Sequence, residues 1–149
     1  MAHKIDDKDL KIIDVLKEHG DYTTRQVAKK TLLPATTIHN RIRALKNDGI
    51  IRKLTILLDN TMIDKTFASY ILISVNLHLL KSKHKGQTDI IKELKRFYFV
   101  ERADIVSGGT DIVALVRVKD VKEFDHVLLE KIQMIEGIEK TQSLIVIHE

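Results

Sequence analysis

Three short stretches with apolar residues at helical spacing occupy the first fifty residues of the chain. The first begins after Asp6, ends before Gly20, and has a broad apolar stripe made of Leu10, Ile12, Ile13 and Leu16. Asp6 can accept hydrogen bonds from the free N–H groups of the first turn. In the second stretch the Thr23 hydroxyl can do the same while Gln26 reaches back, and the pattern ends near Thr31. These residues predict two capped helices.

A third helix is predicted from Pro34 to Gly49, only a few residues after the second. Pro suits a first helical turn because its missing N–H would have no partner there, and Gly is typical of a helix stop. Three helices in this order are typical of a helix-turn-helix preceded by a supporting helix. The third would then be the recognition helix. Its apolar side holds Ile38, Ile42 and Leu45, and its opposite side presents Thr36, Asn40, Arg43 and Asn47.

The polar side of this helix offers the chemistry that reads base edges. Asn can pair bidentately with adenine and Arg with guanine in the major groove, and Thr suits a phosphate or a thymine methyl group. Arg41 lies nearer the flank, so we assign it to a phosphate or to a carboxylate of the same chain. Arg52 and Lys53 follow the helix and can grip backbone phosphates. The predicted contacts to double-stranded DNA are Thr36, Thr37, His39, Asn40, Arg41, Arg43, Asn47, Arg52 and Lys53.

The basic residues of the chain are concentrated around this helix. The formal net charge is +4, yet residues 60–149 hold 13 basic and 13 acidic residues. Residues 22–58 hold eight basic residues and one acidic residue, a net charge of +7. Such a segment attracts polyanions with an affinity that falls steeply as salt rises. A solvated basic face is the alternative, and the turn before the helix together with the local charge favours DNA.

The second half of the chain alternates predicted strands and helices. The segment 50–59 (IIRKLTILLD) is rich in β-branched and aliphatic residues and predicts a strand that links the two halves. Further strands are predicted over 67–79, 99–107, 112–118 and 137–148. Between them, TDIIKELKRF and DVKEFDHVLLEKI predict helices capped at Thr88 and Asp120. The order is βαββαβ, and FVERA after the first helix aligns with GIEKT after the second. A duplicated βαβ unit of this kind folds as a ferredoxin-like sheet with both helices on one face.

A sheet covered on one face leaves apolar residues without cover on the other. The strand residues that cannot all point inward include Ile71, Ile73, Leu115 and Val146. A bare apolar face needs a partner, most economically a second copy of the same chain. We therefore expect a homodimer.

Three motifs, IDDKDLKIIDVL, LPATTIHNRIRALKNDGIIRK and VERADIVSGGTDIVALVRV, together resemble the Lrp/AsnC (leucine-responsive regulatory protein) family of prokaryotic transcription regulators. The resemblance covers nearly the whole chain and implies an α+β fold. The implied fold comprises a helix-turn-helix (winged-helix-like) DNA-binding domain over 1–50, a linking strand and hinge over 51–65, and a βαββαβ effector-binding and oligomerisation domain over 66–149. The implied protein is a sequence-specific regulator, a dimer that can assemble into tetramers or octamers on roughly palindromic promoter DNA. A small-molecule effector, often an amino acid, is implied at a turn that corresponds to Gly108, Gly109, Thr110 and Asp111.

This turn has two interpretations from its residues alone. Adjacent glycines let backbone N–H groups approach a carboxylate, and Asp111 could accept from an ammonium group, so an α-amino acid fits. The same residues are also what a tight hairpin needs. The family often has an acidic residue at the position of Gly109 and an aromatic residue at that of Thr110.

The turn before the predicted recognition helix also departs from the family. The family commonly has Gly at the position of Leu32 and a small hydroxyl residue at that of Pro34.

Composition narrows the possible functions. There is no Cys, and the seven His lack zinc-type spacing, so no metal, cofactor or catalytic residue is predicted. No apolar run approaches the roughly 20 residues that cross a bilayer, so a cytoplasmic location without a membrane partner is expected. We expect a protein that is not an enzyme. The alternatives are an enzyme similar to siroheme decarboxylases, for which the nearby candidates are Arg102, Arg117 and His126, and an effector-sensing assembly protein without DNA binding.

Overall fold

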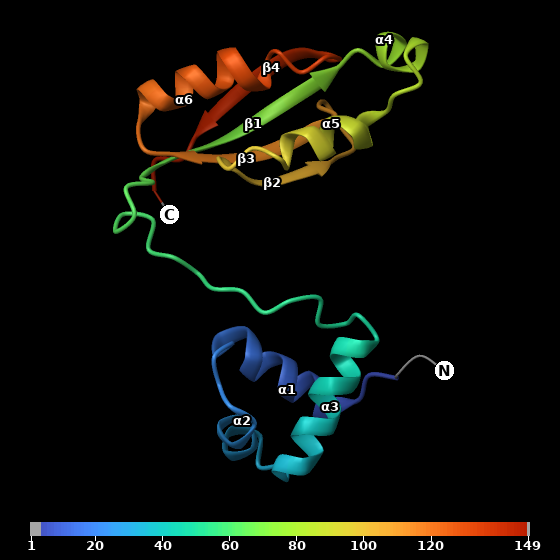
Figure 1. The fold of residues 1–149 in the computed structure, drawn as a ribbon, viewed down its shortest axis with the longest axis vertical. Helices are drawn as coiled ribbons and strands as arrows, with labels where there is room; N and C mark the ends of the chain where they lie inside the picture. Colours follow the sequence, from blue (N-terminus) through green and yellow to red (C-terminus); the bar gives the residue numbers. More distant parts are fainter. Residues whose placement is uncertain (1–3, 149) are drawn as a thin grey trace. The chain divides into compact units, whose positions relative to one another are not determined.

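The computed structural model describes residues 4–148 and divides the chain into two compact units, Met1–Leu58 and Asp59–Glu149 (Figure 1). The first unit contains the three predicted helices, α1 (Asp7–Glu18), α2 (Thr24–Thr31) and α3 (Ala35–Asn47). Their facing sides bury one apolar core, made of Ile12, Leu16, Val27, Ile38 and Leu45. The predicted helix-turn-helix with its supporting helix is confirmed.

The helix ends follow the predicted capping residues with one shift. Asp6 and Thr23 each take part in a reciprocal capping box, in which the side chains at the cap and three residues later satisfy backbone N–H groups. Pro34 stands at the N-cap of α3, one residue before its first turn, and supplies no side-chain hydrogen bond. Gly49 follows α3 with a φ of 71°, the left-handed conformation that ends many helices.

The turn between α2 and α3 is built on Leu32. This residue adopts the left-handed conformation, with φ 57° and ψ 30°, and its side chain is 90% exposed. A residue with a Cβ in this conformation costs roughly 1–2 kcal/mol, which explains why Gly would suit the position. The chain nevertheless makes the sharp reversal that lets α3 begin at Ala35, three residues after Leu32.

The predicted linking strand over 50–59 is wrong for the single chain. Residues 51–58 have no regular secondary structure, and no segment within residues 4–148 pairs with them. A strand forms when a neighbouring strand satisfies its N–H and C=O groups, and apolar, β-branched composition alone does not supply that neighbour. The N–H of Ile51 instead donates to the carbonyl oxygen of Leu45 at 2.9 Å, which attaches the segment to the end of α3.

The second unit is the predicted βαββαβ fold with additional helical turns. Its four strands form one antiparallel sheet in the order β2-β3-β1-β4, as expected for a ferredoxin-like sheet. The strands are β1 (Phe67–Val75), β2 (Val100–Ile105), β3 (Ile112–Val118) and β4 (Ile138–Ile145). The helical segments are α4 (Leu77–Ser82), α5 (Gln87–Leu94), α6 (Val121–Val127) and a π-helical turn η1 (Leu128–Ile132).

Two predictions for this unit need correction. The strand predicted over 67–79 ends at Val75, because Asn76 caps a new helix by accepting from the N–H of Leu79 at 2.9 Å. Thr88 is not the cap of α5, which begins after Gly86. The Asp89 carboxylate accepts from the Gly86 N–H at 3.0 Å and so closes the first turn.

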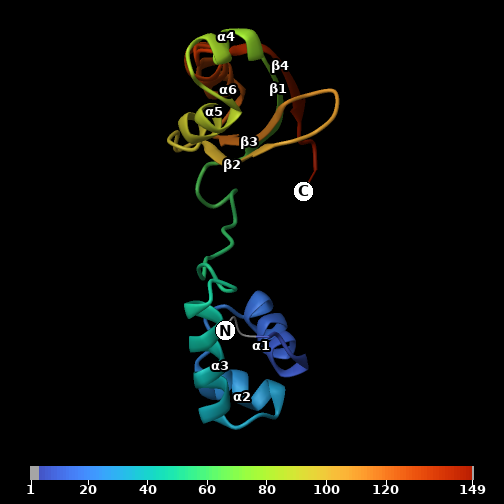
Figure 2. The same cartoon turned by 90° about the vertical axis from the view of Figure 1, so that its right-hand side faces the viewer.

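Helices cover one face of the sheet, and Figures 1 and 2 show α5 and α6 on the same side. Along β1, Ile71 and Ile73 are fully buried on the helix side, whereas Tyr70 on the other side is 45% exposed. The neighbouring strand keeps the alternation, since Ile71 lies opposite Ala114 and Tyr70 opposite Leu115. The predicted division of apolar strand residues between two faces is present.

Candidate DNA-binding surface and ligand hollow

The outer side of α3 carries most of the predicted base-reading residues. Ile38 and Leu45 are fully buried against the other helices, so the side of α3 opposite them faces solvent. The exposed residues of the predicted set on this helix are Thr36, His39, Asn40, Arg43 and Asn47. Thr37 is half-buried at the edge. Lys46 is also exposed on this side and was absent from the predicted contacts, although its place three residues after Arg43 puts it on the same face.

Arg41 is turned toward α1 instead. Its Nη1 donates to Asp6 Oδ1 at 2.7 Å and to Asp9 Oδ1 at 2.8 Å. Asp9 is fully buried, and its other oxygen accepts from the N–H of Asp6 at 3.1 Å. The hydrogen bonds to Asp9 and Asp6 raise the pKa of the Arg41 guanidinium above its usual value. Of the two roles predicted for Arg41, the structure places it in the carboxylate contact, which ties α3 to the start of α1.

Arg52 and Lys53 are exposed where the chain leaves α3. Their starting point is fixed because Ile51 packs against the helical core and bonds to the end of α3. With Arg41 engaged by carboxylates, the cations that remain beside the outer side of α3 include Arg43, Lys46, Arg52 and Lys53. These side chains can reach a polyanion without breaking a contact that holds the fold.

The loop between β2 and β3 stands out on the side of the sheet away from the helices (Figure 2). A hydrogen bond from the Val106 N–H to the Asp111 carbonyl oxygen, 2.9 Å, closes its base. Gly108 has a φ of 149°, which side-chain-bearing residues rarely adopt. A Cβ at Gly108 or Gly109 would meet no atom within 4 Å. The backbone of this loop is therefore open to an approaching ligand.

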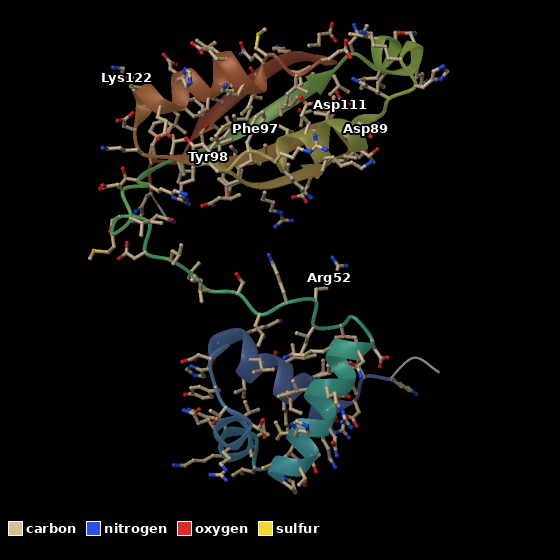
Figure 3. The ribbon with its side chains drawn as sticks, viewed as in Figure 1. Arg52, Asp89, Phe97, Tyr98, Asp111 and Lys122 are labelled. Carbon is tan, nitrogen blue, oxygen red and sulfur yellow. The ribbon has the colours of Figure 1, made fainter. Side chains whose placement is uncertain are left out.

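Asp111 lies between the end of β1 and the start of α5 (Figure 3), and both of its carboxylate oxygens accept hydrogen bonds from the chain. Oδ2 accepts from the Val75 N–H at 2.9 Å, and Oδ1 accepts from Gln87 Nε2 at 3.0 Å. The Thr110 hydroxyl donates to the Ile73 carbonyl oxygen at 2.9 Å. These bonds fasten the loop to β1. The Asp111 carboxylate thus holds the loop in shape, where sequence analysis had considered it as an acceptor for an ammonium group.

A hollow of about 340 Å³ lies beside this loop on the helix-free face. It is lined by Leu72, Ser74, Gly109, Thr110, Lys140 and Gln142. The β1–β4 register places Leu72 opposite Gln142 and Ser74 opposite Lys140, so these four side chains stand on one face. The volume suits a small metabolite. Of the predicted effector residues, Gly109 and Thr110 line the hollow, whereas Gly108 and Asp111 do not.

Ser74, Lys140 and Gln142 line the hollow but were not among the residues predicted from the sequence. They come from two strands that are more than sixty residues apart in the chain, and only the pairing register brings them together. No local spacing reveals a contact of this kind. The one available signal was the alternation along β1, which makes Ser74 a polar residue on the outer face of an apolar strand.

The three residues of the enzyme alternative each take part in a different ion pair. Arg102 pairs with Asp104, Arg117 Nε donates to Glu101 Oε1 at 2.8 Å, and His126 lies 3.2 Å from the carboxylate four residues further along its helix. Residues 4–148 contain no group of three His, Asp or Glu placed to hold a metal ion. Over the same described residues, no helix is both long and apolar enough to span a membrane.

A three-helix unit with a helix-turn-helix, followed by an α+β unit with a ligand-sized hollow, is typical of one class of protein. This class is the helix-turn-helix proteins that carry a separate ligand-binding domain. Comparison of the sequence with family profiles supports this class. Residues 5–52 match the profile described as winged helix-turn-helix DNA-binding, and residues 70–149 match the Lrp/AsnC ligand binding domain. The second match covers more than half of the chain. The chain belongs to the Lrp/AsnC family and is a DNA-binding transcription regulator with a ligand-binding domain.

Individual relatives support the same assignment. The HTH-type transcriptional regulator FL11 of Pyrococcus furiosus is 29% identical over 143 residues, which are 96% of this chain and 89% of FL11. Among solved structures, AsnC of E. coli is 25% identical with a TM-score of 0.81, covering 99% of this chain and 95% of its own. A transcriptional regulator of Neisseria meningitidis, solved as an L-Met complex, shares the fold at 23% identity with a TM-score of 0.87, covering 98% and 92% of the two chains.

Proposed function

We propose that α3 enters the major groove of double-stranded DNA and reads the bases with its outer side. Asn40 and Arg43 are the base-reading residues, for adenine and guanine respectively, and Thr36 contacts a thymine methyl group or a phosphate. Phosphate contacts come from Arg52 and Lys53. The remaining contacts at the edge of the interface come from Thr37, His39, Lys46 and Asn47.

The main support for this proposal is that two arginines of α3 have different surroundings. Arg41 is held by the carboxylates of Asp6 and Asp9, whereas Arg43 is exposed on the outer side of α3. A helix fixed on one side by an internal ion pair, with polar and cationic residues exposed on the other, is suited to present a constant surface to a groove. The net charge of +7 over residues 22–58 supplies the attraction to phosphate.

Footprinting on the DNA upstream of the protein's own gene tests the proposal. We expect two protected half-sites about one helical turn apart, or a multiple of it, as a two-fold symmetric pair of recognition helices requires. Lys53→Ala should weaken binding to all sequences alike, and Arg43→Ala should weaken it at preferred sites. Protection spread evenly along the fragment would contradict the assignment of α3 to base reading.

A homodimer would supply that pair of recognition helices, and we propose that the helix-free face of the sheet forms it. The face presents Tyr70, Leu115, Leu144 and Val146, of which Tyr70 and Leu144 are 45% and 46% exposed. Exposed apolar residues on a central and an edge strand favour a self-complementary contact with two-fold symmetry. Further assembly of such dimers into tetramers or octamers is an extension of this proposal.

Sedimentation velocity on two matched variants tests the dimer. Leu144→Glu places a charge on the helix-free face, and Leu129→Glu places the same charge on the helical side at a residue that is 52% exposed. We expect Leu144→Glu to give monomers, while Leu129→Glu keeps the wild-type mass. Equal masses for both variants would move the dimer contact away from this face.

We also propose that the hollow beside Gly109 and Thr110 binds a small-molecule effector that changes the affinity for DNA. Three features support this: the open backbone of the loop, the polar pair formed by Ser74 and Lys140 across β1 and β4, and the volume of the hollow. The related regulator of Neisseria meningitidis was solved as a complex with L-Met, which makes amino acids the first compounds to test. In this proposal the protein acts on DNA in the cytoplasm and catalyses no reaction, which the separate ion pairs of Arg102, Arg117 and His126 favour.

A further inference from the structure

A second hollow, which we call the α1 groove, lies within the helical unit, between the end of α1 and the segment that leaves α3. Its volume is about 470 Å³. A Cβ added at Gly20 would lie 3.8 Å from the Thr55 carbonyl oxygen, so this segment passes close to the end of α1. Both residues line the groove. Its apolar lining residues are Ile13, Leu16, Ile50, Ile51 and Leu54.

The apolar lining of the α1 groove continues the core of the helical unit. Leu16 belongs to that core, and Ile13 and Ile51 pack against it. Ile50 and Leu54 are 36% and 49% exposed, so part of the lining is in contact with water. An apolar occupant would remove this surface from water, which is favourable in proportion to the area covered.

The charged residues that line the α1 groove are all cations. They are Lys17 on the last turn of α1 and Arg52 and Lys53 on the segment after α3. All three are exposed, and none forms an ion pair with the part of the chain that the structure describes. Each is therefore available to an anionic group of a ligand.

The acidic residues near Lys17 in the chain do not line the groove. At about 100° per residue, Asp14 and Glu18 project about 100° and 140° away from Ile13 around α1, whereas Lys17 is only about 40° from it. Asp21 lies beyond the end of the helix and is not a lining residue either. A ligand in the α1 groove therefore meets apolar and cationic groups on the same side of α1.

This combination selects a ligand that has an apolar body and a negative charge. An inorganic or phosphodiester anion would leave the apolar lining uncovered, and a cationic amphiphile would be repelled by the three cations. An α-amino acid would bring an ammonium group for which the described lining offers no carboxylate. A carboxylate with an aliphatic tail satisfies both parts, because lysine and arginine donate strong hydrogen bonds to carboxylates.

We propose that the α1 groove binds medium-chain fatty acids, with the aliphatic tail on the apolar lining and the carboxylate at Lys17. One consequence rests on the proposed function. Arg52 and Lys53 are the proposed phosphate contacts and also line the α1 groove, so a bound carboxylate competes with the DNA backbone for them. An occupied groove therefore weakens binding to all DNA sequences alike.

Calorimetry on the full chain tests the ligand class with octanoate, acetate and octylamine, each below the concentration at which it forms micelles. We expect octanoate to bind at least about tenfold more tightly than acetate, which lacks the tail, and than octylamine, which carries the opposite charge. From hexanoate to octanoate the affinity should rise about fourfold to fifteenfold, the effect of half or full burial of two methylene groups. Octylamine that binds as tightly as octanoate would overturn the proposal, as would an affinity independent of tail length.

Two leucine variants of one segment test the position of the tail. Leu54→Ser removes an apolar lining residue, and Leu57→Ser makes the same change at a residue that is 100% exposed and does not line the groove. Leu54→Ser should weaken octanoate binding about fivefold to tenfold, and Leu57→Ser should leave it unchanged. Equal losses in the two variants would contradict binding in the α1 groove.

Two lysine variants of α1 test the position of the carboxylate. Lys17→Gln removes a lining charge, and Lys11→Gln does so on the opposite side of the helix. Lys17→Gln should lower the affinity for octanoate about threefold, as expected for one exposed ion pair, without lowering that for octylamine. Lys11→Gln should bind both as wild type does. The same octanoate affinity in both variants would overturn the proposed position of the carboxylate.

Measurements of DNA binding and of mass on the same preparations separate the possible failures. Octanoate should weaken the binding of wild type to specific and random duplexes alike. Specific DNA binding without octanoate binding at millimolar concentration would overturn the groove proposal and leave the regulator unaffected, whereas octanoate binding without specific DNA binding would refute only the proposed function. A smaller mass for Leu54→Ser than for Leu57→Ser in sedimentation velocity would show that a second copy covers the groove, which would also overturn the proposal.

Discussion

Arg41 on α3 donates through Nη1 to Oδ1 of Asp9 on α1 at a distance of 2.8 Å, and Asp9 is fully buried. The recognition helix is therefore fastened to the first helix through an ion pair on the side that faces away from its exposed polar residues. A buried carboxylate that loses its cationic partner is costly, since water cannot replace the lost contact.

Arg41→Ala should lower the free energy of unfolding of the helical unit by about 2–3 kcal/mol, because it leaves the Asp9 carboxylate buried without this partner. Urea unfolding followed by far-UV circular dichroism measures the change. Arg43→Ala is the matched control on the exposed side and should stay within about 0.5 kcal/mol of wild type. Equal losses for the two variants would show that the ion pair does not fasten α3.

Arg43→Ala should cost about 1–3 kcal/mol of binding free energy at a preferred DNA site and relax discrimination at one base position. The reason is that a bidentate contact to guanine is lost while the fold is kept. Competition binding with single-base variants of the site measures the effect. Should random DNA lose the same affinity, Arg43 belongs with the phosphate contacts.

Leu32→Gly should raise the free energy of unfolding by about 1 kcal/mol. The side chain is 90% exposed and the backbone is left-handed, so removing Cβ relieves strain and sacrifices little burial. Leu32→Ala keeps Cβ and is the control that should give no gain. Urea midpoints compare the two variants, and a Gly variant no more stable than the Ala variant would contradict the strained turn.

The ion-pair cluster at Glu136 should make the stability of the sheet unit depend on pH. Lys83 and Lys85 both donate to the Glu136 carboxylate and lower its pKa from 4.5 to about 2. A carboxylate with a lowered pKa in the folded state contributes stability that is complete above its unfolded pKa, near 4.5, and is lost as pH falls through 2.

Glu136→Gln should accordingly be less stable than wild type above about pH 5, with a difference that closes toward pH 2. The cluster is exposed, so added salt should reduce the difference. Glu139→Gln on β4, where the described chain offers no ion pair, is the control that should show no such closing difference. A gap between Glu136→Gln and wild type that is constant with pH would rule out the ion pairs as its cause.

Much of the fold was predictable because its signals are local. The caps at Asp6, Thr23 and Asp120 lie within three residues of the N–H groups they satisfy. The predictions failed where the outcome depends on distant partners. Residues 51–58 have strand composition without a strand to pair with, and β1 ends at Asn76 because a polar cap there begins α4.

The candidate site residues were likewise predictable where the signal is local and unpredictable where it depends on distant partners. The outer side of α3 follows from helical spacing, so its exposed residues were predictable one by one. The lining of the hollow does not follow from local spacing, because Lys140 comes close to the loop at Gly109 only through the pairing of β4 with β1. Asp111 shows a further limit, since its sequence position did not reveal that its two carboxylate oxygens accept hydrogen bonds from Val75 and Gln87.

Sequence reading by α3 can be measured by fluorescence anisotropy, with the protein's own upstream DNA and a scrambled duplex of equal composition compared across a salt series. We expect the natural duplex to bind at least about 10³-fold more tightly than the scrambled one. We also expect the logarithm of the association constant to fall linearly with the logarithm of the salt concentration, with a slope that is smaller by about 1 in Lys53→Ala. Equal affinity for the two duplexes at every salt concentration would contradict the assignment of α3 to sequence reading.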